Sequence, residues 1–215
     1  MSFKSCRETR RGIYCKKSSN ASNKYKKLVF NDLYDEYSSP DQISNIITKL
    51  YSNNIKELHI NRISGMDVEI NLAIQRNNSL NSLIISNTEI DYSDLLLIRN
   101  LLRRKQLHTL KLQNVGLENE QVILISDVLT ESGLVELDIS NNKDISDIGG
   151  EAILKAIKTN VSLNLNKIKE INVSGTEISR KIIAEMEQYI RVIPAFRWKH
   201  MKELLQKEEE YGYKI

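Results

Sequence analysis

Three histidines and two cysteines are the side chains of this sequence best suited to bind a metal or carry a proton. His59, His108 and His200 form no His-x-x-x-His pair, and Cys6 and Cys15 match no common zinc or redox spacing. In the repeat pattern described below, His59 and His108 fall on strands with one strand between them. That places them roughly 10 Å apart at the usual strand spacing, too far to share a metal. We therefore expect no metal site and no catalytic histidine.

Phosphate chemistry lacks its usual motif as well. Gly149-Gly150 lies at a predicted helix start without the Lys-Ser/Thr sequence of a phosphate-binding loop. Because no complete catalytic set can be assembled, the sequence predicts a non-enzymatic protein with no cofactor and no small-molecule substrate.

The first 27 residues form a basic arm that carries one acid, Glu8. Its cations are Lys4, Arg7, Arg10, Arg11, Lys16, Lys17, Lys24, Lys26 and Lys27, interleaved with Phe3, Tyr14 and Tyr25. Arms of this kind bind RNA phosphates or acidic protein surfaces. The composition also fits a solvated tail or an organellar transit peptide. In isolation we expect the arm to be disordered, since it offers little apolar surface.

Five short segments share one pattern, with aliphatic residues at their first, fourth and sixth positions. They begin at Ile55, Leu80, Leu107, Leu134 and Ile168, separated by 25, 27, 27 and 34 residues. Each leads into a predicted helix, over 66–77, 92–104, 118–132, 147–160 and 179–192. A strand-like unit and a helix repeated in this way predict a solenoid with a parallel sheet on its concave side and helices on its convex side.

Two segments flank the repeats. Residues 28–54 are predicted to form an N-terminal cap or degenerate first repeat, with Ser39-Pro40 starting a helix. Residues 194–215 are predicted to form a C-terminal capping helix and tail, with Trp198, Met201, Leu204 and Leu205 on one face. The predicted organisation is an arm (1–27), a cap (28–54), a solenoid (55–193) and a C-terminal cap (194–215).

The five units resemble leucine-rich repeats of the ribonuclease-inhibitor-like class, to which tropomodulin and the Ran GTPase-activating protein belong. The resemblance covers roughly residues 40–193 and implies an α/β leucine-rich-repeat solenoid. The ninth position, often Asn or Cys in that class, is Asn only at Asn142, and the fourth unit is lengthened by 143–144 and 161–167.

Alternate strand positions predict the concave face, because side chains alternate across a strand. The third-position row is Glu57, Ser82, Thr109, Glu136 and Glu170. The fifth-position row is His59, Ile84, Lys111, Asp138 and Asn172. The seventh is Asn61, Ser86, Gln113, Ser140 and Ser174, and the eighth is Arg62, Asn87, Asn114, Asn141 and Gly175. We take His59, Arg62, Ile84, Asn87, Lys111, Gln113, Asn114, Glu136, Asp138 and Asn141 as the candidate partner-binding residues; the alternative is a solvated sheet face.

These observations favour a scaffold or adaptor subunit that docks protein partners within a larger assembly and is tethered by its arm. One alternative is a ribosome- or ribonucleoprotein-associated factor whose arm contacts RNA. A second, by fold analogy alone, is a regulator of a GTPase or of actin. No apolar run approaches the roughly 18 residues of a membrane span. With both cysteines in the arm, we expect a reducing intracellular compartment, the cytoplasm, with the mitochondrion as the alternative.

Overall fold

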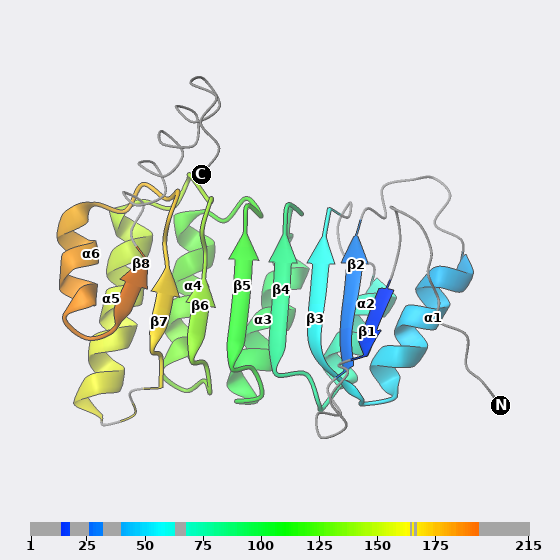
Figure 1. Cartoon of the computed structure of the whole chain (residues 1–215). Helices are drawn as coiled ribbons and strands as arrows, with labels where there is room; N and C mark the ends of the chain where they lie inside the picture. The colour runs from blue at the N-terminus through cyan, green and yellow to red at the C-terminus, as the bar shows by residue number, and fades with distance from the viewer. Residues whose placement is uncertain are drawn as a thin grey trace, which may run out of the picture.

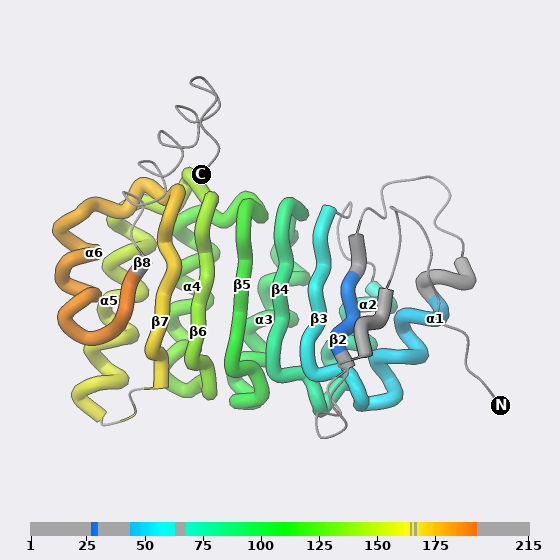
Figure 2. Tube along the Cα trace, viewed as in Figure 1, coloured from blue at the N-terminus to red at the C-terminus, as the bar shows by residue number. Residues whose placement is uncertain are grey.

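The computed structural model describes residues 14–17, 26–31, 40–62, 68–163, 165 and 167–193. Strands and helices alternate along the chain, and the strands form one sheet with the helices stacked on one side of it (Figure 1). The strand order follows the sequence from β1 to β8; β1 pairs antiparallel with β2, and all later neighbours pair parallel. The Cα trace in Figure 2 shows the same strand–helix unit repeated along the chain. This is an α/β repeat fold.

The strands are β1 (Tyr14–Lys17), β2 (Lys26–Asn31), β3 (Ile55–Asn61), β4 (Ser82–Ser86), β5 (Thr109–Gln113), β6 (Glu136–Asp138), β7 (Glu170–Asn172) and β8 (Arg191–Ile193). The helices are α1 (Pro40–Tyr51), α2 (Val68–Arg76), α3 (Tyr92–Arg103), α4 (Asn119–Leu129), α5 (Asp147–Ser162) and α6 (Arg180–Glu187). Within these residues, no helix is both long and apolar enough to cross a bilayer.

The core lies between the sheet and the helices and runs without a break through the repeats. The fourth-position residues Leu58, Leu83, Leu110, Leu137 and Ile171 are each at most 1 % exposed. Full burial of such a side chain stabilises the fold by about 1.5–3 kcal/mol. The repeated aliphatic positions are therefore what hold each strand to its helix.

The five strands expected from the repeat pattern are confirmed as β3 to β7, each followed by a helix. At the C-terminal end the expected helix over 179–192 is too long. Helix α6 ends at Glu187, and Arg191–Ile193 forms β8 beside β7. Ile190 and Val192 are both 7 % exposed while Arg191 between them is exposed, which is the two-residue period of a strand.

The sheet also extends beyond the predicted units at the N-terminal end. Strand β2 begins at Lys26, inside the segment assigned to the arm, and pairs Leu28 with Leu58 of β3. Leu28 therefore takes a fourth position and is fully buried. The predicted cap thus contributes a strand and helix α1, which is a first repeat. The predicted C-terminal capping helix, 194–215, lies outside the described residues.

A buried asparagine joins two successive repeats at the turn after β6. The Oδ1 atom of Asn142 accepts hydrogen bonds from the backbone N–H groups of Val115 and Leu117, at 2.9 and 3.1 Å. Its Nδ2 atom donates to the carbonyls of Leu112 and Ile139, both at 2.8 Å. The side chain is 2 % exposed. It therefore satisfies backbone groups of two successive repeats that water does not reach.

Candidate interaction surface

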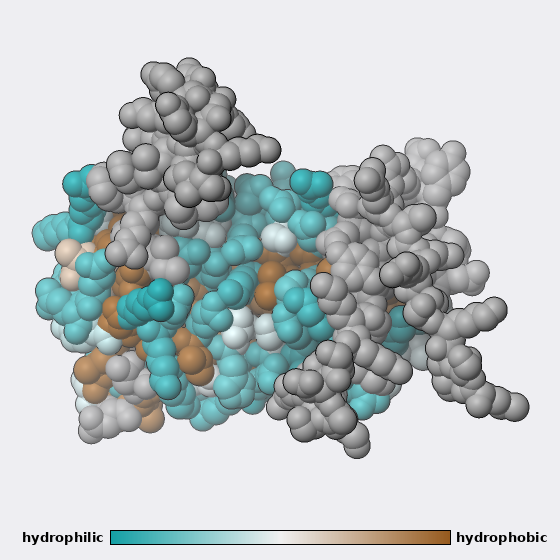
Figure 3. All heavy atoms as spheres, in the orientation of Figure 1, coloured by the Kyte–Doolittle hydropathy of each residue, from teal (hydrophilic) through white to brown (hydrophobic). Residues whose placement is uncertain are grey.

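The strands bring the predicted rows together on the face away from the helices. Pairing aligns His59 with Ile84, Lys111, Asp138 and Asn172 across β3 to β7, so the predicted fifth-position register is confirmed. Strand β2 adds Val29 to this row, beside His59. The third-position row likewise gains Lys27 at one end and Arg191 at the other. Figure 3 shows this face as mostly hydrophilic, with a hydrophobic patch near its middle and further hydrophobic patches toward its C-terminal end.

At the N-terminal end of the face, Glu57 lies between two basic groups. Its Oε1 atom is 3.0 Å from Nζ of Lys27 and 2.5 Å from Nε2 of His59. Partial burial alone would raise the pKa of Glu57, but the hydrogen bonds from Lys27 and His59 outweigh it and lower the pKa. Glu57 is therefore ionised at neutral pH.

His59 is held in its neutral form by the same surroundings. Burial lowers its pKa, the positive charges of Lys27 and Lys111 lower it further, and Glu57 only partly opposes them. A neutral imidazole bonded to a carboxylate must donate through Nε2. His108, the other histidine of the repeats, bonds instead to the carbonyl of Gln106 through Nδ1.

A second polar network crosses β5 to β7. Nζ of Lys111 is 2.5 Å from Oε1 of Glu136. The carboxylate of Asp138, 4 % exposed, accepts from Nε2 of Gln113 at 2.7 Å and from Nδ2 of Asn172 at 3.1 Å. Between these two networks lies Ile84, half-buried and flanked by Ser82 and Ser86 on its own strand. The arrangement offers an apolar contact point bordered by charged and polar side chains, which suits binding.

The eighth-position row has a backbone role. Arg62, Asn87, Asn114 and Asn141 all have left-handed backbones, with φ of 54°, 52°, 53° and 62°, and Gly175 has φ of 75°. Asparagine and glycine tolerate this conformation better than most residues. Nδ2 of Asn114 donates to Asn87, and Nδ2 of Asn87 donates to Asn61, both at 2.9 Å. The left-handed turn after each strand accounts for the asparagines and the glycine of this row. The predicted role of the row in partner binding stays a prediction.

The structure places only part of the basic arm. Lys16 and Lys17 lie in β1 and Lys26 and Lys27 in β2, with Lys16 paired to Lys27 and Lys17 to Lys26. The remaining predicted cations, Lys4, Arg7, Arg10, Arg11 and Lys24, lie outside the described residues.

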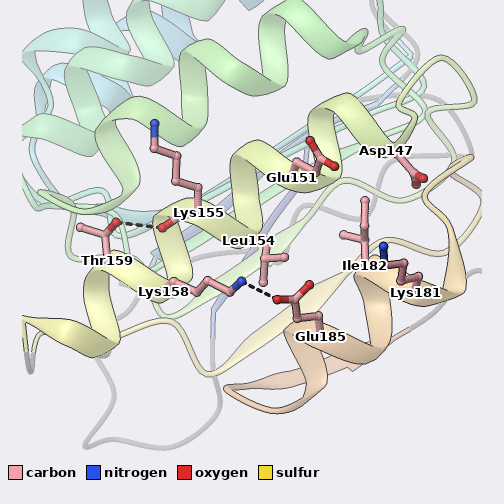
Figure 4. A pocket seen from close by; sticks show the side chains of 9 residues that line it. All are labelled: Asp147, Glu151, Leu154, Lys155, Lys158, Thr159, Lys181, Ile182 and Glu185. Atoms are coloured by element: carbon pink, nitrogen blue, oxygen red, sulfur yellow. Dashed lines mark hydrogen bonds and ion pairs between the residues drawn. The ribbon is translucent and has the colours of Figure 1, made fainter.

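Sequence reasoning missed a groove between α5 and α6, of about 470 Å³ (Figure 4). Leu154 and Ile182 line it together with three lysines and three acids: Lys155, Lys158, Lys181, Asp147, Glu151 and Glu185. Lys158 and Glu185 pair across it. Because the groove has as many lysines as acidic residues, its charge favours neither an anionic nor a cationic ligand. In the described part of the chain, no three His, Cys, Asp or Glu side chains gather as metal ligands would.

The sequence matches no protein-family model and no curated protein. Among solved structures, the chain is similar to a crystal structure of a protein from Bacteroides fragilis, with a TM-score of 0.49 and 19% sequence identity. The match covers 66% of this chain and 41% of that one, so this chain spans less than half the length of the protein it matches.

Proposed function

We propose that the protein is a leucine-rich-repeat adaptor of the ribonuclease-inhibitor-like class that docks a protein partner on its concave face. The class is supported by the repeat period, the parallel sheet and the buried Asn142 at a ninth position. The docking role is supported chiefly by one observation. Ile84 stands half-buried at the middle of a polar face, between the Glu57 network and the Lys111 network.

The chemistry of this face defines the partner that it fits. An apolar side chain of the partner would lie over Ile84, and polar groups beside it would face the charged side chains on either side. Those charges are already paired within the sheet, so they contribute specificity and orientation more than affinity. We therefore expect a partner that presents a protruding apolar residue within a mixed-charge surface.

The test is sedimentation of a native extract with the wild type and two variants. Ile84→Asp places a charge at the proposed contact point. Leu163→Asp makes the same kind of change at a 58 % exposed site at the end of α5, outside the rows of the sheet. We expect the wild type and Leu163→Asp to sediment with a large assembly and Ile84→Asp to sediment free. Free migration of all three would overturn the adaptor role, and co-migration of all three would move the contact off the concave face.

A second candidate function is a contact between the basic arm and RNA. The observation that favours it is the register of β1 and β2, which sets Lys16 beside Lys27 and Lys17 beside Lys26. Binding of a structured RNA should then weaken with salt, with a log–log slope of roughly −0.7 to −0.9 per neutralised phosphate. Lys16→Gln with Lys17→Gln should make that slope shallower. A flat salt dependence, or assembly that survives ribonuclease, would leave only the protein-docking role.

A further inference from the structure

The outer surface of the helices carries exposed apolar side chains in successive repeats. Leu72 of α2 is 43 % exposed, Leu96 of α3 39 % and Ile123 of α4 36 %, and Val68 and Tyr92 at the starts of α2 and α3 are exposed further. Exposed aliphatics on neighbouring elements are typical of an interaction surface. Helices α2, α3 and α4 lie on the side of the sheet opposite the concave face (Figure 1).

The repeat sets the helices in step, so the outward rows of α3 and α4 lie at the same height. The strands that precede them, β4 and β5, align Leu83 with Leu110, which is a shift of 27 residues. The same shift of 27 relates Leu96 to Ile123 and Asn100 to Asp127. Each helix therefore presents one aliphatic residue, with polar residues one and two turns farther along.

The polar ends of these two rows have opposite charge. Helix α3 ends with exposed Arg103, whereas α4 presents exposed Asp127, followed by exposed Glu131. In the described part of the chain, none of these three side chains forms an ion pair. By the same shift of 27, Arg103 corresponds to position 130, which lies between Asp127 and Glu131. A basic residue beside two acidic residues at nearly the same height is self-complementary about a twofold axis.

We propose that a second copy of this chain docks on this surface through α3 and α4. The twofold axis would lie in the interface, parallel to the helices and between α3 and α4. Rotation about that axis sets Leu96 of one copy against Ile123 of the other. It also sets Arg103 against Asp127 and Glu131 of the second copy, and each contact occurs twice. Because two convex surfaces meet over few helices, we expect a small interface and a dissociation constant on the order of micromolar.

The dimer leaves both concave faces turned outward, in opposite directions. If the proposed docking role is right, the dimer would hold two partners, or one partner at two sites, and gain avidity from linkage. This consequence rests on the proposed function. The dimer itself is tested without any partner, so failure of one proposal is distinguishable from failure of the other.

The experiment is sedimentation equilibrium of the purified full chain across a micromolar concentration series. The wild type should approach twice its 24.8 kDa mass. Arg103→Glu and Glu131→Arg should each raise the dissociation constant about tenfold or more, since each turns two symmetric contacts repulsive. An equimolar mixture of the two variants should dimerise again, because in the mixed dimer the introduced glutamate faces the introduced arginine and the other contact keeps both native side chains. Glu187→Arg on α6 is the matched control and should dimerise as the wild type does.

Circular dichroism establishes that each variant is folded. A wild type that stays monomeric throughout the series would overturn the proposal. So would a dimer that survives both charge reversals, since it would form through another face. Failure of the mixture to recover dimerisation, with both variants folded, would equally overturn it.

Discussion

The two faces of the sheet-and-helix layer treat charged side chains in opposite ways. On the concave face, Glu57 is bonded to Lys27 and His59, and its pKa is lowered. In the helical layer, Asp94 of α3 is 1 % exposed, and burial raises its pKa despite a hydrogen bond from Nδ2 of Asn71 at 2.8 Å. The same functional group is thus stabilised as an anion on one face and penalised on the other.

The difference between the two faces follows from the spacing of strands and of helices. Strands 4.7–4.9 Å apart bring side chains of neighbouring repeats close enough to pair, so the concave charges neutralise one another. Helices pack farther apart, at 8–10 Å. Lys158 and Glu185 pair between α5 and α6, but Arg103 of α3 and Glu131 after α4 form no ion pair within the described chain. On the proposed functions, the paired charges of the concave face would orient a partner, and the unpaired Arg103 and Glu131 would serve the proposed dimer.

The largest expected effect comes from removing the buried amide of Asn142, which joins two successive repeats. Asn142→Ala leaves buried N–H groups of Val115 and Leu117 and the carbonyl of Leu112 without these partners. Each unsatisfied buried group costs about 1–3 kcal/mol. We expect the free energy of unfolding to fall by about 3 kcal/mol or more, measured by urea denaturation.

Its neighbour provides the control for that measurement. Asn141 has a left-handed backbone with φ of 62°, which glycine adopts without strain. Asn141→Gly should change the free energy of unfolding by less than about 0.5 kcal/mol. Equal losses at both positions would show that the turn, and not the buried amide, carries the stability.

An intermediate effect is expected at Asp94. Its folded pKa lies above its unfolded value of 3.8, so its stabilising contribution is complete below that value and is lost as the pH rises through the folded pKa. Asp94→Asn cannot ionise, and its amide can donate to the buried Oδ1 of Asn71, which has no partner. We expect the variant to be more stable than the wild type by about 1 kcal/mol at pH 7 and equally stable near pH 3.

Asp91, the N-cap of the same helix, should behave in the opposite sense. Hydrogen bonds from the backbone of Asp94 and from the side chain of Ser93 lower its pKa. Asp91→Asn should therefore lose a little stability at pH 7. For Asp94, the contrary result would be an Asp94→Asn variant that is less stable than the wild type at pH 7. It would mean that the hydrogen bonds accepted by the Asp94 carboxylate outweigh the cost of burying its charge.

How far the sequence predicts these two faces depends on how regular each repeat is. Strands β3 to β7 were predictable because three aliphatic positions recur in each, and their register followed from aligning the repeats. Strands β2 and β8 were not, because each retains only part of the pattern. In β2, Lys26 pairs with first-position Ile55, and β8 is followed by Pro194, which has no N–H for a ladder.

The charges of the concave face were predicted by position but not by partner. Aligned repeats place Lys111 of β5 beside Asp138 of β6, yet the ammonium group of Lys111 bonds to Glu136, which is also on β6. Glu57 was assigned to the third row, and its partner Lys27 to a separate arm, since nothing local in the sequence joins residues 30 apart. Asp91 and Asp94 have the spacing of a capping box, but no motif predicts the burial of Asp94 or the proposed contact of Arg103 with Asp127. Both depend on how neighbouring helices face one another.

The smallest expected effect concerns the concave pair itself. Glu57 has a folded pKa below its ordinary value of 4.5, so its contribution is present above that pH and is lost as the pH falls through the folded pKa. Its side chain is 37 % exposed, so screening by water limits the contribution to about 0.5 kcal/mol. Glu57→Gln should lower the free energy of unfolding by that amount at pH 7. The difference from the wild type should vanish near pH 3 and shrink in about 1 M salt. Glu187→Gln on α6 is the control for removing an exposed carboxylate outside the concave network. A Glu57→Gln loss that persists unchanged at pH 3 would mean that the concave face is held by shape and hydrogen bonding, and that the contrast in charge between the two faces does not determine stability.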